Sequence, residues 1–127
     1  KLKDKTALVT GSTAGIGLAI AKKLLEEGAT VYINGRTGER VNDAIQQLKE
    51  DVPGVNVKGV PADFGKVDEV NNLIKQIPPV DILINNVGIF EPKQFVDIPD
   101  EDWLKFYEVN VMSGIRLSRN YFPKMLK

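Results

Sequence analysis

The sequence contains no cysteine and no histidine. Without cysteine the chain can form no disulfide, and it offers neither a thiolate metal ligand nor a cysteine nucleophile. Without histidine it lacks the commonest general base, the commonest metal ligand and any serine–histidine catalytic triad. The sequence therefore predicts no metal site among these residues.

An excess of charge of either sign is also missing, because 17 basic residues balance 17 acidic ones. A nucleic-acid-binding protein normally carries a basic excess that neutralises phosphates, so a nucleic-acid partner is not expected. No stretch approaches the ~20 consecutive apolar residues that a membrane helix needs, and the charged start Lys1–Lys5 shows no secretory signal. We therefore expect a soluble cytoplasmic protein without a membrane partner.

The 127 residues fall within the usual size of one domain. Apolar residues make up 43% of the chain and charged residues 27%, which excludes a disordered or collagen-like protein. No repeat, linker or low-complexity segment divides the sequence. We therefore treat residues 1–127 as one domain.

Apolar runs alternate along the chain with segments of helical spacing. Strands are predicted over 6–10, 30–34, 55–62 and 80–85, and helices over 16–27, around 41–48, over 67–77 and from about 101 to the end. Asn56 and Lys58 interrupt the third strand and place it at a sheet edge. Strands separated by helices of this length predict βαβ units and a parallel α/β sheet.

The last predicted helix carries apolar residues around most of its circumference. A surface helix shows one apolar stripe, so this helix needs partners on several sides. It either packs on its own sheet and is capped by the long loop before it, or it contacts another subunit or further chain.

Gly11, Gly15 and Gly17 lie between the first strand and the first helix. A diphosphate can approach this turn closely only where no Cβ stands in the way. The free N–H groups and the dipole of the helix start favour the anion, and Ser12 and Thr13 can add hydroxyl donors. Because the turn joins a strand to a helix within a ~30-residue βαβ unit, it predicts a dinucleotide site rather than a purely structural turn.

The segment Thr10–Gly17 resembles the Thr-Gly-x-x-x-Gly-x-Gly motif of the classical short-chain dehydrogenase/reductase family. Asn85–Gly88 resembles the family's Asn-Asn-Ala-Gly motif, with Val87 in place of alanine. Asp63 matches the family's adenine-contacting aspartate, and Asn110 matches its helical catalytic asparagine. The resemblance covers the whole chain and implies a Rossmann-type, doubly wound parallel sheet with strand order 3-2-1-4.

The resemblance implies that the backbone of Ser12–Gly17 holds the pyrophosphate and that Asp63 accepts a hydrogen bond from the adenine amino group. Asn86 and Gly88 would line the adenosine ribose. By residue type alone, Asp63 is equally a cap for the third helix and Asn86 a turn former. The candidate cofactor-binding residues are Gly11, Ser12, Thr13, Gly15, Ile16, Gly17, Asn34, Arg36, Thr37, Asp63, Phe64, Asn86, Val87 and Gly88.

Asn110 is the candidate catalytic residue. Asparagine is unfavourable inside a helix, and such a violation of local preference is typical of functional positions. The resemblance implies that the Asn110 backbone carbonyl helps to hold a proton-relay water. It also implies that Asn85 and Thr10 join the fourth strand to the first turn.

The end of the second strand bears on which nicotinamide cofactor binds. Rossmann proteins that prefer NAD place a carboxylate there for the ribose 2′-hydroxyl, whereas here Gly35 takes that place and Arg36 follows it. A guanidinium grips a 2′-phosphate, and one such pair is worth roughly 1–4 kcal/mol. We therefore expect NADP(H) rather than NAD(H), unless Arg36 is simply an exposed residue. The residues expected to assist Arg36 are Asn34, Thr37 and Ser12.

The family's chemistry needs a tyrosine with a lysine four residues later, and none of the 3 tyrosines has one. The chain therefore resembles the amino-terminal half of such an enzyme, and alone it is expected to bind cofactor weakly and to turn over nothing. The leading hypothesis is the cofactor-binding part of an NADP(H)-dependent oxidoreductase acting on a small carbonyl or secondary alcohol. The alternative is a non-catalytic nucleotide-binding or regulatory module.

The order 3-2-1-4 would leave the fourth strand as an open apolar edge. We therefore expect a homo-oligomer, formed through that edge or through the last helix. A different Rossmann protein, such as a sugar-nucleotide epimerase or methyltransferase, is a third hypothesis. The glycine spacing and the segment Asn85–Gly88 argue against it.

Overall fold

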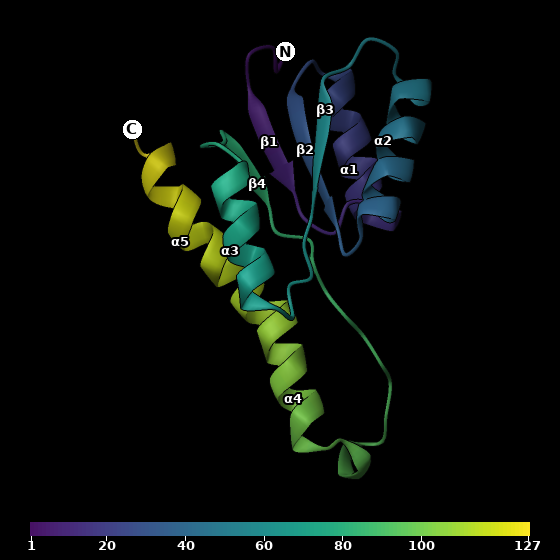
Figure 1. Cartoon of the computed structure of the whole chain (residues 1–127), viewed down its shortest axis with the longest axis vertical. Helices are drawn as coiled ribbons and strands as arrows, with labels where there is room; N and C mark the ends of the chain where they lie inside the picture. Colours follow the sequence, from purple (N-terminus) through teal and green to yellow (C-terminus); the bar gives the residue numbers. More distant parts are fainter.

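The computed structural model describes all of residues 1–127 and shows strands alternating with helices (Figure 1). The strands are β1 (Thr6–Val9), β2 (Thr30–Gly35), β3 (Val57–Pro61) and β4 (Ile82–Ile84). The helices are α1 (Gly15–Glu26), α2 (Gly38–Asp51), α3 (Val67–Gln76), α4 (Asp100–Tyr107) and α5 (Ser113–Met125). A 3₁₀ turn, η1 (Phe95–Asp97), precedes α4, and a π-helical segment, η2 (Glu108–Met112), joins α4 to α5.

The sheet has the order β3-β2-β1-β4, and every neighbouring pair is parallel. This confirms the predicted α/β fold, the strand order and the edge position of the third strand. The fourth strand is shorter than predicted. Its pairing with β1 covers only Ile82–Ile84, and the Asp81 side chain before it accepts a hydrogen bond from the Thr6 amide at 2.9 Å.

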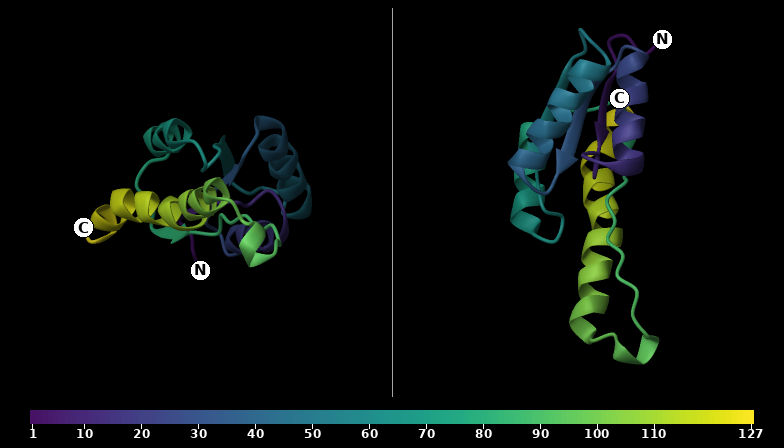
Figure 2. Two further views of the ribbon diagram at one scale, coloured as in Figure 1. Left: turned by 90° about the horizontal axis from the view of Figure 1, so that it is seen from below. Right: turned by 90° about the vertical axis from the view of Figure 1, so that its right-hand side faces the viewer.

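Alternate residues of the strands point to opposite faces of the sheet, and each face carries its own core. Ala7 and Val9 of β1 pack with α1 and α2, whereas Leu8 packs with α3 and α5. Two views agree that α1 and α2 lie on one side of the sheet and α3 and α5 on the other (Figures 1 and 2). Because both faces are covered, the strands are nearly continuous apolar runs.

The segment from α4 through α5 forms one long rod, and α4 extends past the carboxyl ends of the strands (Figure 2). Only one stripe of this rod is buried, through residues such as Val109, Leu117 and Tyr121. The preceding loop is tied to α4 by an ion pair between Lys93 and Asp102, whose hydrogen bond raises the pKa of Lys93. Packing on the chain's own sheet and loop therefore accounts for only part of the apolar surface of this helix.

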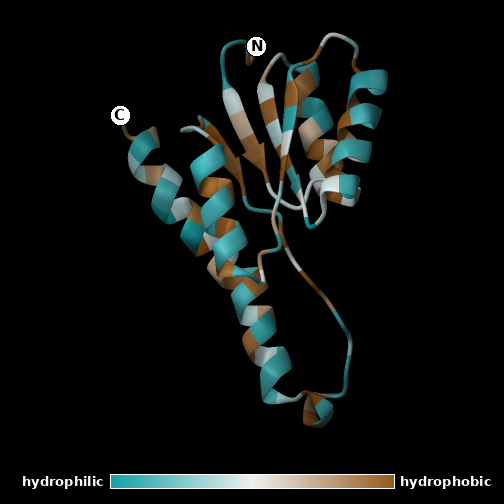
Figure 3. Ribbon diagram, viewed as in Figure 1, coloured by the Kyte–Doolittle hydropathy of each residue, from teal (hydrophilic) through white to brown (hydrophobic).

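Hydrophobic residues recur along the ribbon of the rod (Figure 3), and several of them are exposed. The large apolar side chains exposed there are Trp103, Leu104, Tyr107, Val111, Ile115, Phe122 and Leu126. None of the helices in the chain combines the length and apolar character needed to cross a bilayer.

Tyr121 links α5 to the end of α3. Its side chain is fully buried, and its hydroxyl donates a hydrogen bond to the Ile77 carbonyl at 3.0 Å. Burial, with a smaller contribution from the charge of Tyr32, raises the pKa of Tyr121 to about 12. Because the folded-state pKa exceeds the ~10 of an unfolded tyrosine, this group stabilises the fold below about pH 10 and loses that effect as the pH rises through about 12.

We expect Tyr121→Phe to lower the free energy of unfolding by about 1 kcal/mol near neutral pH, because it removes one buried hydrogen bond. Between about pH 10 and 12 the parent chain should lose about 2 kcal/mol more than the variant. Urea unfolding of both proteins across this range measures the difference. A difference that stays constant with pH would contradict the assignment.

Candidate functional site

A groove of about 410 Å³ lies at the carboxyl ends of the strands. The chain places β2 and β4 on opposite sides of β1, so this is the point at which an open α/β sheet forms its ligand crevice. The groove has the volume of a small-molecule site. The predicted residues that line it are Gly11, Thr13, Asn34, Arg36, Asp63, Phe64, Asn86, Val87 and Gly88.

Other predicted residues do not line the groove. These are Ser12, Gly15, Ile16, Gly17, Thr37 and Asn110. The groove also includes Ala14 of the predicted pyrophosphate segment, Gly35 at the end of β2 and Ile89. The lining residues that the sequence analysis did not select are Arg40, Ala62, Lys105 and Val109.

The glycine turn has the backbone that its sequence predicts. Gly11 and Gly15 have left-handed φ angles of 58° and 60°. A Cβ on Gly17 would lie 2.4 Å from the Gly11 carbonyl oxygen and 2.5 Å from Asn86 Nδ2, so this position accepts no side chain. Helix α1 begins with no side-chain cap and no acidic residue in its first turn, which leaves its first N–H groups available to an anion.

Asn34 at the end of β2 holds this turn in place. Its Oδ1 accepts a hydrogen bond from the Gly11 amide at 3.1 Å, and its backbone carbonyl accepts one from the Ser12 amide at 2.8 Å. The Ser12 hydroxyl in turn accepts from the Asn34 amide and donates to the Val9 carbonyl. Both side chains are fully buried and take part in these hydrogen bonds, and their expected role beside Arg36 remains a prediction.

The segment after β4 is joined to the same turn. Thr10 Oγ1 accepts hydrogen bonds from the Asn86 and Val87 amides at 3.0 and 3.2 Å, and Asn86 Nδ2 donates to the Gly11 carbonyl at 3.1 Å. These contacts bring Asn86 and Val87 to the groove. Asn85 behaves differently from the prediction, because its side chain donates to Ser118 of α5 and not to the turn.

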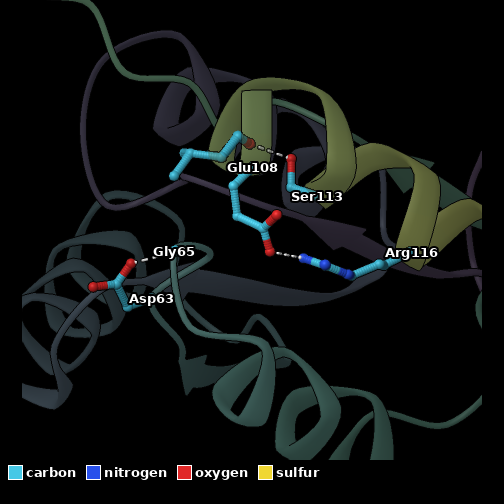
Figure 4. Close-up of polar contacts among 6 residues, drawn as sticks. Asp63, Gly65, Glu108, Ser113 and Arg116 are labelled. Atoms are coloured by element: carbon cyan, nitrogen blue, oxygen red, sulfur yellow. Dashed lines mark hydrogen bonds and ion pairs between the residues drawn. The ribbon is translucent and has the colours of Figure 1, made fainter. Parts of the chain in front are cut away.

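Asp63 lies after β3 and is half-buried in the groove wall. One oxygen of its carboxylate accepts a hydrogen bond from the Gly65 amide at 2.8 Å (Figure 4). The N-cap position of α3 is Lys66, so the alternative that Asp63 caps this helix is wrong. The second carboxylate oxygen of Asp63 forms no hydrogen bond within the chain and is available to a ligand.

Two guanidinium groups belong to residues of the groove wall. Arg36 and Arg40 both line it, are both exposed and take no part in the salt bridges of the chain. Thr37 caps α2 by accepting a hydrogen bond from the Arg40 amide at 3.2 Å, so its side chain is engaged in the helix start. Arg40 lies in the first turn of α2, whereas Arg36 precedes the helix, so no regular spacing joins the two in the sequence.

Asn110 holds the loop after β4 through two hydrogen bonds to one residue. Its Oδ1 accepts from the Ile89 amide at 2.7 Å, and its Nδ2 donates to the Ile89 carbonyl at 3.0 Å. Ile89 lines the groove, whereas Asn110 does not. The Asn110 side chain therefore positions the wall of the groove from behind.

The local structure around Asn110 explains why asparagine is tolerated between α4 and α5. It lies in η2, whose π-helical turn is of the kind often found at functional sites. Glu108 and Arg116 form an ion pair of 2.6 Å across the segment, and the Ser113 hydroxyl donates to the Val109 carbonyl, also at 2.6 Å (Figure 4). These contacts hold the irregular turn between two regular helices.

The chain contains no group of three or more acidic side chains placed so that they could hold a metal ion. The only carboxylate in the groove wall is that of Asp63, against the cationic groups of Arg36, Arg40 and Lys105. The groove therefore favours a negatively charged ligand.

Known proteins with similar sequences are oxidoreductases. Residues 5–127 match the protein family described as short chain dehydrogenase. It is 52% identical over 126 residues to the uncharacterized oxidoreductase YvaG of Bacillus subtilis, a match that covers 99% of this chain and 48% of that protein. It is 37% identical over 131 residues to the 3-oxoacyl-[acyl-carrier-protein] reductase FabG of Aquifex aeolicus, covering 100% of this chain and 52% of that protein.

The fold is similar to that of L-sorbose reductase from Gluconobacter frateurii, solved as a complex with NADPH and L-sorbose. The TM-score is 0.90 and the sequence identity 34%, and the match covers 98% of this chain and 48% of that one. The chain thus spans about half the length of the proteins that it matches.

The tight approach at Gly17 leads to a test of the turn. We expect Gly17→Ala to lower the free energy of unfolding by about 2 kcal/mol or more, because its Cβ would meet a backbone oxygen that hydrogen bonds hold in place. Gly38→Ala is the matched control, since nothing lies within 4 Å of its Cβ position. Urea unfolding should show a loss of stability for Gly17→Ala and no loss for Gly38→Ala. Equal stability of the two variants would contradict this prediction, because it would mean that the turn can shift to accept a side chain at position 17.

Proposed function

The chain belongs to the short-chain dehydrogenase family, and we propose that it forms the NADP(H)-binding part of an oxidoreductase. The reaction would transfer a hydride between the nicotinamide ring and a carbonyl or secondary alcohol. One observation supports this more than any other. Ala14, which directly precedes a helix whose first turn holds no acidic residue, lines the same groove as the two unpaired guanidinium groups of Arg36 and Arg40.

The groove residues suit the chemical parts of such a cofactor. The free N–H groups at the start of α1 would hold the pyrophosphate, and nothing in the chain lies within 4 Å of the Cβ position of Gly15. The unpaired oxygen of Asp63 would accept a hydrogen bond from the adenine amino group. Arg36 and Arg40 would bind a 2′-phosphate, which the absence of a carboxylate at Gly35 allows.

The bound nicotinamide would supply or accept the hydride, and this chain would position it. Asn110 would hold the Ile89 wall of the groove through its side chain, and its backbone carbonyl would contact a proton-relay water. A tyrosine with a lysine four residues later is absent from this sequence. We therefore propose that the 127 residues bind cofactor weakly and catalyse no turnover alone.

The same absence supports a second candidate function, a nucleotide-binding or regulatory module without catalysis. Both candidates require dinucleotide binding. They differ in whether a longer chain containing these residues reduces a carbonyl compound. L-Sorbose reductase, with its NADPH complex, favours the first candidate, because it has this fold at 34% identity.

The cofactor preference can be tested by titrating the chain with NADPH and with NADH and following nucleotide fluorescence. We expect tighter binding of NADPH, and Arg36→Ala should weaken it about tenfold or more while hardly changing the binding of NADH. Arg119→Ala, which removes an exposed guanidinium from α5, is the control. Equal losses for the two nucleotides in the Arg36 variant would refute the assignment.

We also propose that the chain self-associates through the exposed apolar face of α4 and α5. Leu104 and Leu126 are 71% and 72% exposed there, so burial on a second copy would remove a large apolar area from water. Sedimentation equilibrium should show dimers, and Leu104→Glu should shift them toward monomers. Gln46→Glu adds the same charge on the exposed side of α2 and should not. A monodisperse monomer at all concentrations would contradict the proposal.

A further inference from the structure

A side chain at position 35 would overlap with the side chain of Thr13 in the groove wall. A Cβ built on Gly35 would lie 2.4 Å from the Thr13 methyl carbon and 3.2 Å from the Thr13 hydroxyl oxygen. Carbon atoms that are not bonded do not approach so closely, since their contact distance is about 3.5 Å or more. The Thr13 side chain therefore occupies the space where any side chain at position 35 would begin.

Neither backbone can withdraw to relieve this contact. The Gly35 carbonyl accepts a hydrogen bond from the Ala62 amide at 2.9 Å, and Gly35 pairs with Pro61 in the sheet. On the other side, the Ser12 amide is bonded to the Asn34 carbonyl at 2.8 Å. These bonds hold the end of β2 and the turn beside it at a fixed separation.

The obstacle is the outer part of the Thr13 side chain. The Thr13 Cβ itself would be 3.4 Å from the added atom, which is an ordinary contact. Threonine branches at Cβ and has restricted rotation about χ1, so moving its methyl group away costs energy. Alanine at position 13 would remove the two atoms that crowd a Cβ atom at position 35.

We propose that Thr13 is a specificity-determining residue for the cofactor, because its methyl group keeps position 35 free of a side chain. A carboxylate at the end of β2 would accept a hydrogen bond from a ribose 2′-hydroxyl and repel a 2′-phosphate. Thr13 excludes that carboxylate and leaves the site to Arg36 and Arg40. This inference rests on the proposed function and adds that the nucleotide preference depends on positions 13 and 35 jointly.

The packing part of the inference is tested by a double-mutant cycle on stability. Gly35→Ala should lower the Tm by about 5 °C or more in the parent chain, and by less than half as much in the Thr13→Ala background. Thr13→Val keeps the methyl group and removes the hydroxyl, so Gly35→Ala should remain destabilising in that background. Equal losses of Tm in all three backgrounds would overturn the inference.

The specificity part is tested by titrating the same set of chains with NADPH and with NADH. Gly35→Asp alone should bring no gain in NADH affinity, because its carboxylate cannot enter the groove. Adding Thr13→Ala should raise NADH affinity about tenfold over Gly35→Asp alone. A gain for NADH from Gly35→Asp alone, or no gain from the double variant, would overturn the role of Thr13.

The two proposals fail in different ways. If the parent chain binds neither nucleotide, the proposed function is wrong and the specificity role falls with it, whatever the stability cycle shows. If the parent binds NADPH but the effects at positions 13 and 35 are additive, only the inference about Thr13 is wrong.

Discussion

The hydrogen bonds of Asn34 are the constraint on which the groove depends. Three of the seven residues Gly11–Gly17 in the turn after β1 are glycines, whose backbone is conformationally permissive. Asn34 supplies the missing restraint, because its side chain binds the Gly11 amide on one side and the Val60 carbonyl on the other at 3.1 Å each. One buried, fully paired amide therefore aligns the ends of β1, β2 and β3, and such a network rigidifies its surroundings.

Much of the fold followed from the sequence, because apolar runs and helical spacing report burial directly. The polar residues Asn56 and Lys58 correctly placed β3 at an edge. The break between α4 and α5 was not foreseen, since a π-helical turn leaves no mark in hydrophobic periodicity. Residue type also could not reveal that the Asn34 side chain bonds within the protein. An amide side chain can bond to the protein or to a ligand, and only the tertiary structure decides which of the two occurs.

The site shows the same division between what is local and what is not. The turn at Gly11–Gly17 was recognisable because its requirements are met by neighbours in sequence. Lys105 and Val109 reach the groove from a helix that begins far along the chain, so no local pattern predicts them. Together the groove residues form a cationic site, in which Arg36, Arg40 and Lys105 outnumber the single carboxylate of Asp63. This charge balance favours an anionic ligand.

The π-helical segment η2 sets the rotational phase of everything after it. A π turn contains one residue more than an α turn, so it acts as a single-residue insertion within the rod. If residues 108–112 were instead wound as a regular α-helix with no residue removed, α5 would be rotated by up to about 100° relative to α4, because the extra residue would then add a full α-helical step. Leu117 and Tyr121 would then leave the core, although no residue contacting them had changed. The π-helical turn therefore determines which residues of α5 face the sheet.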